Sequence, residues 1–372
     1  MRGVYTATYL ASVADGFARQ CGSGALDVGR AFDLIVGTSV GGIIACALAA
    51  DLPLPAVVEL FRTEGQHIFP RKLPAGIGFS LFVDLLRRPR ANHKGNEALR
   101  HALDQRFGST TLAEVYNRRG IALAITAVEL GQHRSWVFKT PHWPGSNHRD
   151  DHYRLVDVCL ATSAAPVYRS LAALNHPDAP SGHFVFADGG LWANNPVLVG
   201  LIEALNIAAP EQEIQVFCLG TCPRPAGEQV QKADVHRGLV QWKFGGLVAP
   251  LAIDSQEFAF DHMARMLSRH IKRPCEIVRF PSERVPAAIM SHLDLDETRA
   301  GAIDALINQA RSDASMAHSR CQDLKDRDGQ FIKALFADAQ SRGTTSIPST
   351  PHGAGVTEGT TQAGSTSQTK EN

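Results

Sequence analysis

Short apolar segments alternate with helical segments along the first 225 residues, and this alternation limits the folds open to the chain. Four segments have the length and apolar content of buried strands: 32–37, 120–130, 183–187 and 213–220. Helical patterns separate them, at 40–50, 97–107, 154–162 and 194–205. Because parallel neighbouring strands need a crossover between them, the order predicts a three-layer α/β fold with a mostly parallel central sheet.

Local signals predict where some helices begin and end. Apolar residues between 10 and 17 repeat at helical spacing, and Gly22 is expected to end this first helix. Asn96 is the predicted cap of the helix at 97–107. From about residue 255 the pattern is mainly helical around one short apolar strand at 275–280, so we expect this C-terminal part to pack on the same core.

The last thirty residues differ in composition from the rest. Residues 1–342 are predicted to form one domain, whereas 343–372 are rich in serine, threonine and glycine and contain almost no large apolar side chains. Such a segment cannot bury enough apolar surface to offset the entropy lost on ordering. Residues 343–372 are therefore a predicted disordered tail.

Charge and cysteine content exclude several classes of protein. Lysine plus arginine equal aspartate plus glutamate at 37 each, so no overall field favours a nucleic acid polymer. The seven cysteines are scattered in apolar surroundings, which is typical of reduced thiols, and Cys218 and Cys222 lack a second pair for a zinc site. We expect no metal, no cofactor and a cytoplasmic location.

No segment has the length expected of a transmembrane helix. The uncharged stretch at 34–50 falls short of the roughly 20 apolar residues that span a bilayer. The opening residues resemble a weak signal peptide, but the tyrosines and threonines between positions 5 and 9 are atypical of its apolar region, so export is not the prediction.

The sequence "FDLIVGTSVGG" places Ser39 between an apolar strand and a helix of small residues. In a strand-to-helix elbow, glycines two residues before and after the serine prevent collisions, and Gly37 and Gly41 hold those positions. The helix that starts at Val40 points its free N–H groups at the turn, where they suit a developing oxyanion. This context favours a catalytic serine over a structural turn.

A serine nucleophile needs a base, and Asp188 in "HFVFADGGLWANNP" is the candidate. The α/β-hydrolase order with a later histidine does not fit, because only 38 residues precede Ser39 and that fold needs several strands first. Strands ending at Gly37 and Ala187 in one parallel sheet would bring Ser39 and Asp188 to the same edge. The alternative is a turn aspartate that binds its own backbone.

Four motifs carry a resemblance to a known family: "GTSVGG", "ATSAAPVY" at 161–168, "ADGGLWANNP" and "FCLGT". In this order and spacing they resemble the patatin-like phospholipases over residues 1–225, which makes 226–342 a helical extension of the same hydrolase domain. The resemblance implies a patatin-like fold, a lipid acyl hydrolase of the phospholipase A type, and a Ser-Asp dyad without histidine. It assigns Ser39 as nucleophile, Asp188 as base, and Gly189 and Gly190 as the rest of the DGG motif.

The resemblance also carries expectations about partners. The substrate would be a phospholipid or another acyl lipid, reached by peripheral contact with a membrane. Some bacterial members of the family respond to nucleotide signals, so a nucleotide-type activator is left open. No cofactor is implied.

The start of the chain departs from the family pattern. The family opens with a strand and a glycine-rich loop, GGGxRG, of which Arg2 and Gly3 match the end. Because loss of an oxyanion donor costs a hundredfold to a thousandfold in rate, about 10 to 30 further residues are expected upstream of Met1. A chain that truly started at Met1 would be an impaired binding or regulatory module; an esterase for small soluble esters is a third alternative.

Two polar stretches have plainer interpretations. His142, His148 and His152 lie near Asp150 and Asp151, and a polar loop is favoured over a metal site there. The basic stretch 87–94 could contact anionic lipid headgroups, but solvated basic residues are the commoner case.

Overall fold

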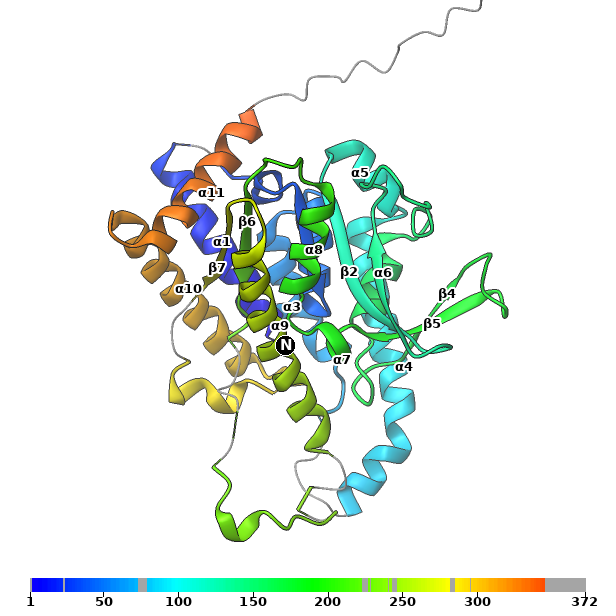
Figure 1. Cartoon of the computed structure of the whole chain (residues 1–372). Helices are drawn as coiled ribbons and strands as arrows, with labels where there is room; N and C mark the ends of the chain where they lie inside the picture. Colours follow the sequence, from blue (N-terminus) through cyan, green and yellow to red (C-terminus); the bar gives the residue numbers. More distant parts are fainter. Residues whose placement is uncertain are drawn as a thin grey trace, which may run out of the picture.

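The structure is a computed structural model, with a mixed β-sheet surrounded by helices (Figure 1). It describes residues 2–22, 24–72, 79–222, 227, 229–239, 241–242, 246–281, 285–294 and 296–344. The predicted tail lies outside the described residues from 345 onward, and positions 343–344 end a helix, α11 (Arg327–Thr344).

The central sheet has five strands and mixed directions. They are β1 (Leu34–Thr38), β2 (Ala122–Glu129), β3 (Arg134–Lys139), β4 (Ala172–Asn175) and β5 (His183–Asp188). Only β1 and β2 pair in parallel, whereas β2 pairs antiparallel with β3 and β5, and β4 pairs antiparallel with β5. The predicted mostly parallel sheet is therefore wrong.

Short connections explain the antiparallel pairs. Residues 130–133 join β2 to β3, and residues 176–182 join β4 to β5. A parallel crossover needs a dozen or more residues, so these strands must turn back on their neighbours. The sequence patterns missed β3 and β4, and without them the order of elements looked like a simple strand-helix repeat.

Two further strands form a separate parallel pair. β6 (Ile214–Leu219) and β7 (Cys275–Phe280) match the predicted segments and pair over their whole length. Within the described part of the chain, neither pairs with the central sheet. Helix α8 (Val197–Ile207) packs against both β1 and β6, so it links the two sheets.

Helices cover both faces of β1. Gly200 in α8 approaches Val36, while Gly37 lies against the backbone of α2 (Val40–Ala49). Because successive strand residues point to opposite faces, α8 and α2 lie on opposite sides of the strand. Helix α6 (Leu155–Thr162) packs against both α2 and β2. Helix α7 (Gly190–Ala193) packs against α9 (Val248–His270).

The first helix belongs to the core. Helix α1 (Gly3–Gln20) packs between α3 (Leu54–Ile68) and α10 (Ala300–Gln322), and Tyr5 is 1% exposed. The hydroxyl of Tyr5 donates a hydrogen bond to Asp313 of α10. The helix ends near Gly22 as predicted, and the stretch that resembles a weak signal peptide is part of the packed fold.

Helix α4 (Phe79–Phe107) is much longer than predicted. Asn96 lies inside it, so the prediction that Asn96 caps a helix is wrong. The basic stretch 87–94 also belongs to this helix, and the charge of Arg88 is paired with the buried Asp84. The remaining described helices are α5 (Leu112–Arg119), with a capping box at Thr111, and three short 3-10 turns, η1 (Val28–Ala31), η2 (Lys232–Asp234) and η4 (Ala287–His292).

Candidate active site

Ser39 occupies a strained elbow between β1 and α2. Its φ is 55° and its ψ is −126°, a backbone conformation that side-chain-bearing residues rarely adopt. Such strain persists only where surrounding contacts hold it, and it is the geometry of a nucleophile elbow. The Ser39 N–H donates to Thr162 Oγ1 at 2.8 Å, which ties the elbow to the end of α6.

Two glycines make the sharp turn possible, but they are not the predicted pair. A Cβ on Gly37 would lie 2.5 Å from the carbonyl oxygen of Gly41, so only glycine fits there. A Cβ on Gly41 would meet nothing within 4 Å, which contradicts the steric role predicted for it. Gly42 takes that role instead, because its Cβ would lie 2.8 Å from Thr162 Cγ2.

The structure brings Ser39 and Asp188 together. Ser39 Oγ donates a hydrogen bond of 2.6 Å to Asp188 Oδ2. The predicted contact is present, but the parallel strands predicted to produce it are not. In the register of the sheet, Thr38 lies opposite Thr126 and Asp188 opposite Ala127, so β1 and β5 run toward each other along β2 and their carboxyl ends meet at its middle.

Backbone contacts hold the carboxylate of Asp188 in place. Its Oδ1 accepts a 2.7 Å hydrogen bond from the Gly190 N–H, and its own N–H donates to the Ala164 carbonyl. A Cβ on Gly189 would lie 2.2 Å from Thr126 Oγ1, so the glycine lets β5 end tightly against β2. The DGG sequence thus combines a buried acid, a close approach and an N–H donor.

The environment of Asp188 makes it a better proton acceptor than an ordinary aspartate. Burial raises the pKa of Asp188 from 3.8 to about 6, against the opposing effects of the Ser39 hydroxyl, the Gly190 N–H and the positive charge of Arg169. Desolvation penalises the charged carboxylate, and this penalty exceeds what the hydrogen bonds recover. A hydroxyl that donates directly to such a carboxylate can pass its proton to it.

A cavity of about 1080 Å³ extends from Ser39 and Asp188 between β1 and β6. Arg2 and Gly3, at the start of α1, line it near the elbow, and a Cβ on Gly3 would collide with Val40 Cγ1. The Val40 N–H makes no hydrogen bond within the described part of the chain. Of the three residues predicted to stabilise an oxyanion, Gly3 and Val40 therefore lie at the elbow, and Arg2 lines the same cavity.

Sequence patterns missed two residues of the site: Thr162, which supports the elbow, and Arg169, which lines the cavity. Thr162, which holds the elbow, lies within the "ATSAAPVY" motif but was not assigned a role. Arg169 follows that motif directly and lines the cavity with Asp188. A lone arginine in a loop gives no periodic or spacing signal, so only the three-dimensional contacts identify it.

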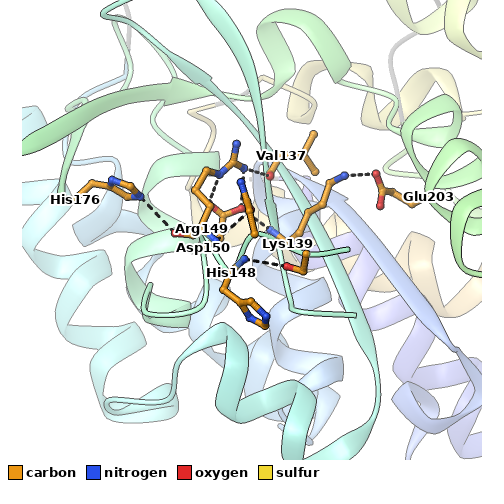
Figure 2. Close-up of polar contacts among 9 residues, drawn as sticks. Val137, Lys139, His148, Arg149, Asp150, His176 and Glu203 are labelled. Carbon is orange, nitrogen blue, oxygen red and sulfur yellow. Dashed lines mark hydrogen bonds and ion pairs between the residues drawn. The ribbon is translucent and has the colours of Figure 1, made fainter. Parts of the chain in front are cut away.

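The polar loop at 142–152 is held by contacts within the loop and with β3. Figure 2 shows Arg149 paired with Asp150 and donating to the Val137 carbonyl, while Asp150 also accepts from the Lys139 N–H at 3.0 Å. His148 lies in this loop and pairs with Asp151. No cluster of metal-binding side chains occurs among the described residues, and all seven cysteines are free.

None of the helices in the described ranges is long and apolar enough to cross a bilayer. A mixed α/β fold with a serine on a strained elbow and a buried carboxylate in contact with it is the arrangement of a serine-type ester hydrolase. A family model described as patatin-like phospholipase matches residues 1–201. The chain belongs to this patatin-like family, and it is an ester hydrolase that acts on lipids.

Similar proteins also carry phospholipase or patatin-like names. A "cGAMP-activated phospholipase" of Pseudomonas aeruginosa is 38% identical over 270 residues, 71% of each chain. A protein of the same name in Vibrio cholerae is 30% identical over 336 residues, 87% of this chain and 90% of that protein. A plant relative, "Patatin-like protein 1" of Oryza sativa, is 30% identical over 182 residues, which cover 46% of this chain and 41% of that protein.

Proposed function

We propose that this chain cleaves acyl ester bonds of membrane phospholipids with a dyad of Ser39 and Asp188. The observation that carries the proposal is the 2.6 Å hydrogen bond from the elbow serine to a buried carboxylate whose pKa is raised to about 6. The names of the two bacterial relatives support phospholipids as the substrate class.

In the proposed reaction, Ser39 Oγ attacks the carbonyl carbon of the ester while its proton passes to Asp188. The carbon-oxygen bond to the lipid alcohol then breaks, and that alcohol leaves with the proton from Asp188. A water molecule then attacks the acyl-enzyme and gives a proton to Asp188. The acyl bond to Ser39 Oγ breaks, Asp188 returns the proton to Oγ, and the fatty acid is released. Asp188 therefore acts as base in each attack and as acid when each leaving group departs.

The charge that develops on the carbonyl oxygen needs donors fixed in advance. We assign this role to the Val40 N–H at the start of α2, together with the backbone of Arg2 and Gly3, where Gly3 packs against Val40. The N-terminal ends of α1 and α2 both face this part of the cavity, so their dipoles favour negative charge there.

Exposed apolar residues near the dyad support contact with a lipid surface. Leu191, directly after the DGG motif, is 45% exposed. Phe258 on α9, which packs against α7, is 79% exposed. Contiguous exposed apolar patches mark surfaces that bind a membrane or another partner, and we propose that these two side chains belong to one that contacts lipid. We further propose that a nucleotide activates the enzyme, because both bacterial relatives are named as cGAMP-activated.

The test is fatty acid release from phospholipid vesicles, with and without cGAMP. Ser39→Ala and Asp188→Asn are each expected to lower the rate at least about a thousandfold, because each removes one half of the proton transfer. Ser319→Ala and Asp178→Asn alter exposed residues that do not line the cavity, and they should leave the rate unchanged. A fluorophosphonate probe should label Ser39 in the parent protein.

Two results would contradict the proposal. Full activity in Ser39→Ala would show that another group attacks the ester. Failure of both vesicle hydrolysis and probe labelling in the folded parent protein, with cGAMP present, would favour the alternative of a binding or regulatory module. Hydrolysis of short soluble esters without any hydrolysis of vesicles would favour the third alternative, a soluble esterase.

A further inference from the structure

Arg169 lies in the loop at 163–171 and is 6% exposed, yet it lines the same cavity as Ser39 and Asp188. It donates one hydrogen bond, from Nη2 to Asn96 Oδ1 at 3.1 Å. Its Nε is buried without a hydrogen-bond partner among the described residues. A guanidinium carries five N–H donors, so most of its binding capacity is unused.

Arg169 also differs from two other arginines with buried side chains, because these two pair with carboxylates. Arg88 pairs with Asp84, and Arg119 pairs with Asp27 and Asp51. Arg169 forms no ion pair with any residue in the described ranges, and the charge that acts on it is the more distant carboxylate of Asp188. Burial lowers the pKa of Arg169 to about 10, so the group is still charged near neutral pH.

A buried cation without a close anionic partner is costly, and an anion that enters the cavity would supply the partner. Arginine suits one anion chemistry above others, because its planar fork matches the oxygens of a phosphate bidentately. In a glycerophospholipid the phosphate is only a few bonds from the nearest acyl ester. One cavity can therefore hold the ester at Ser39 and the phosphate at Arg169.

We propose that Arg169 binds the phosphodiester of a glycerophospholipid whose acyl ester lies at Ser39, and that it selects phospholipids over neutral acyl lipids. This inference rests on the proposed phospholipase function and adds the residue that recognises the substrate. Asn96 positions the guanidinium through its hydrogen bond, and Nε keeps a donor that no residue in the described ranges takes up.

The test compares two substrates with the same acyl chains in neutral detergent micelles: phosphatidylglycerol and diacylglycerol. Arg169→Gln is expected to lower kcat/KM for phosphatidylglycerol about a hundredfold, because a charged bidentate contact is lost. Its kcat/KM for diacylglycerol should fall by much less, so the ratio between the substrates changes at least tenfold. The exposed Arg62→Gln, which removes the same charge elsewhere, should leave that ratio unchanged.

Measurements well above pH 6 keep Asp188 ionised in both proteins, so a shift in its pKa does not enter. Labelling of Ser39 by a fluorophosphonate at the parent rate would show that the variant is folded with its dyad intact. Arg169→Lys keeps the charge without the fork and should recover part of the lost selectivity.

Equal losses on both substrates would overturn the proposal, since Arg169 would then act only through Asp188 or through folding. An unchanged ratio would overturn it too. If inorganic phosphate altered diacylglycerol hydrolysis through Arg169 while phosphatidylglycerol hydrolysis ignored the substitution, the site would serve a free phosphate instead. All these assays contain cGAMP. A parent protein that hydrolyses neither lipid under these conditions would refute the proposed function itself, a result distinct from all of these.

Discussion

At the scale of single residues, the raised pKa of Asp188 sets the direction of the pH dependence. In the proposed mechanism, a protonated Asp188 cannot accept the Ser39 proton, so activity requires the ionised carboxylate. Because burial raises this pKa to about 6, kcat/KM should be constant above that value and fall about tenfold per pH unit below it. A pH-rate profile on phospholipid vesicles measures this limb. A limb near the ordinary aspartate pKa of about 3.9 would contradict the raised pKa, and a profile without any such limb would mean that Asp188 is not the base.

The two proposed catalytic residues could be predicted from the sequence because each combines a local signal with its neighbours. Ser39 lies between glycines at the end of an apolar strand, and Asp188 precedes two glycines at the end of another. Arg169 could not be predicted, because its importance depends on burial, on the missing carboxylate partner and on a cavity built from distant segments. Such properties belong to the folded chain and leave no local pattern.

At the scale of elements, alanine substitutions in the turn from β1 into α2 test which glycines the elbow needs. Gly37→Ala should destabilise the fold by about 1–3 kcal/mol, because its methyl group overlaps the backbone of Gly41. Gly41→Ala is the matched control: its methyl group meets open space inside a helix, where alanine is favoured over glycine by up to about 1 kcal/mol. Urea unfolding of both variants gives the comparison, and an equal effect of the two would contradict the assigned crowding.

The strand directions were predicted wrongly because two strands, β3 and β4, have weak sequence patterns. The strands β2 and β6 lie in apolar runs, and the helices between them have clear periodicity. The hairpin partners β3 and β4 instead mix exposed and buried residues over six and four positions, which is a weak pattern. When β3 and β4 are missed, every predicted strand is separated from the next by a helix. The rule that parallel neighbours are joined by a helical crossover then predicts a parallel sheet, because two strands are absent from the list.

At the scale of the whole molecule, the two ends of the described chain pack together, which supports one cooperative domain. Helix α1 lies against α10, and the Tyr5 hydroxyl donates to Asp313 across 308 positions of sequence. Asp313 is 5% exposed, and its other oxygen accepts from Gln309. The segment that resembles the family over 1–225 therefore shares its first helix with the C-terminal extension.

Removal of this contact should weaken the entire fold. Tyr5→Phe leaves Asp313 with one buried oxygen unpaired, and the loss of a hydrogen bond to a charged group costs about 1.5–3 kcal/mol. In one cooperative domain, the fluorescence of the tryptophans, which reports the sheet around Trp136, and circular dichroism, which reports the helices, should show the same lowered midpoint in urea. In Asp313→Asn the hydrogen bond from Tyr5 is already weakened. Adding Tyr5→Phe to this variant should therefore lower the free energy of unfolding by less than it does in the parent chain. Separate midpoints for the two signals would instead divide the sheet from the C-terminal helices, and the extension would then be a domain of its own.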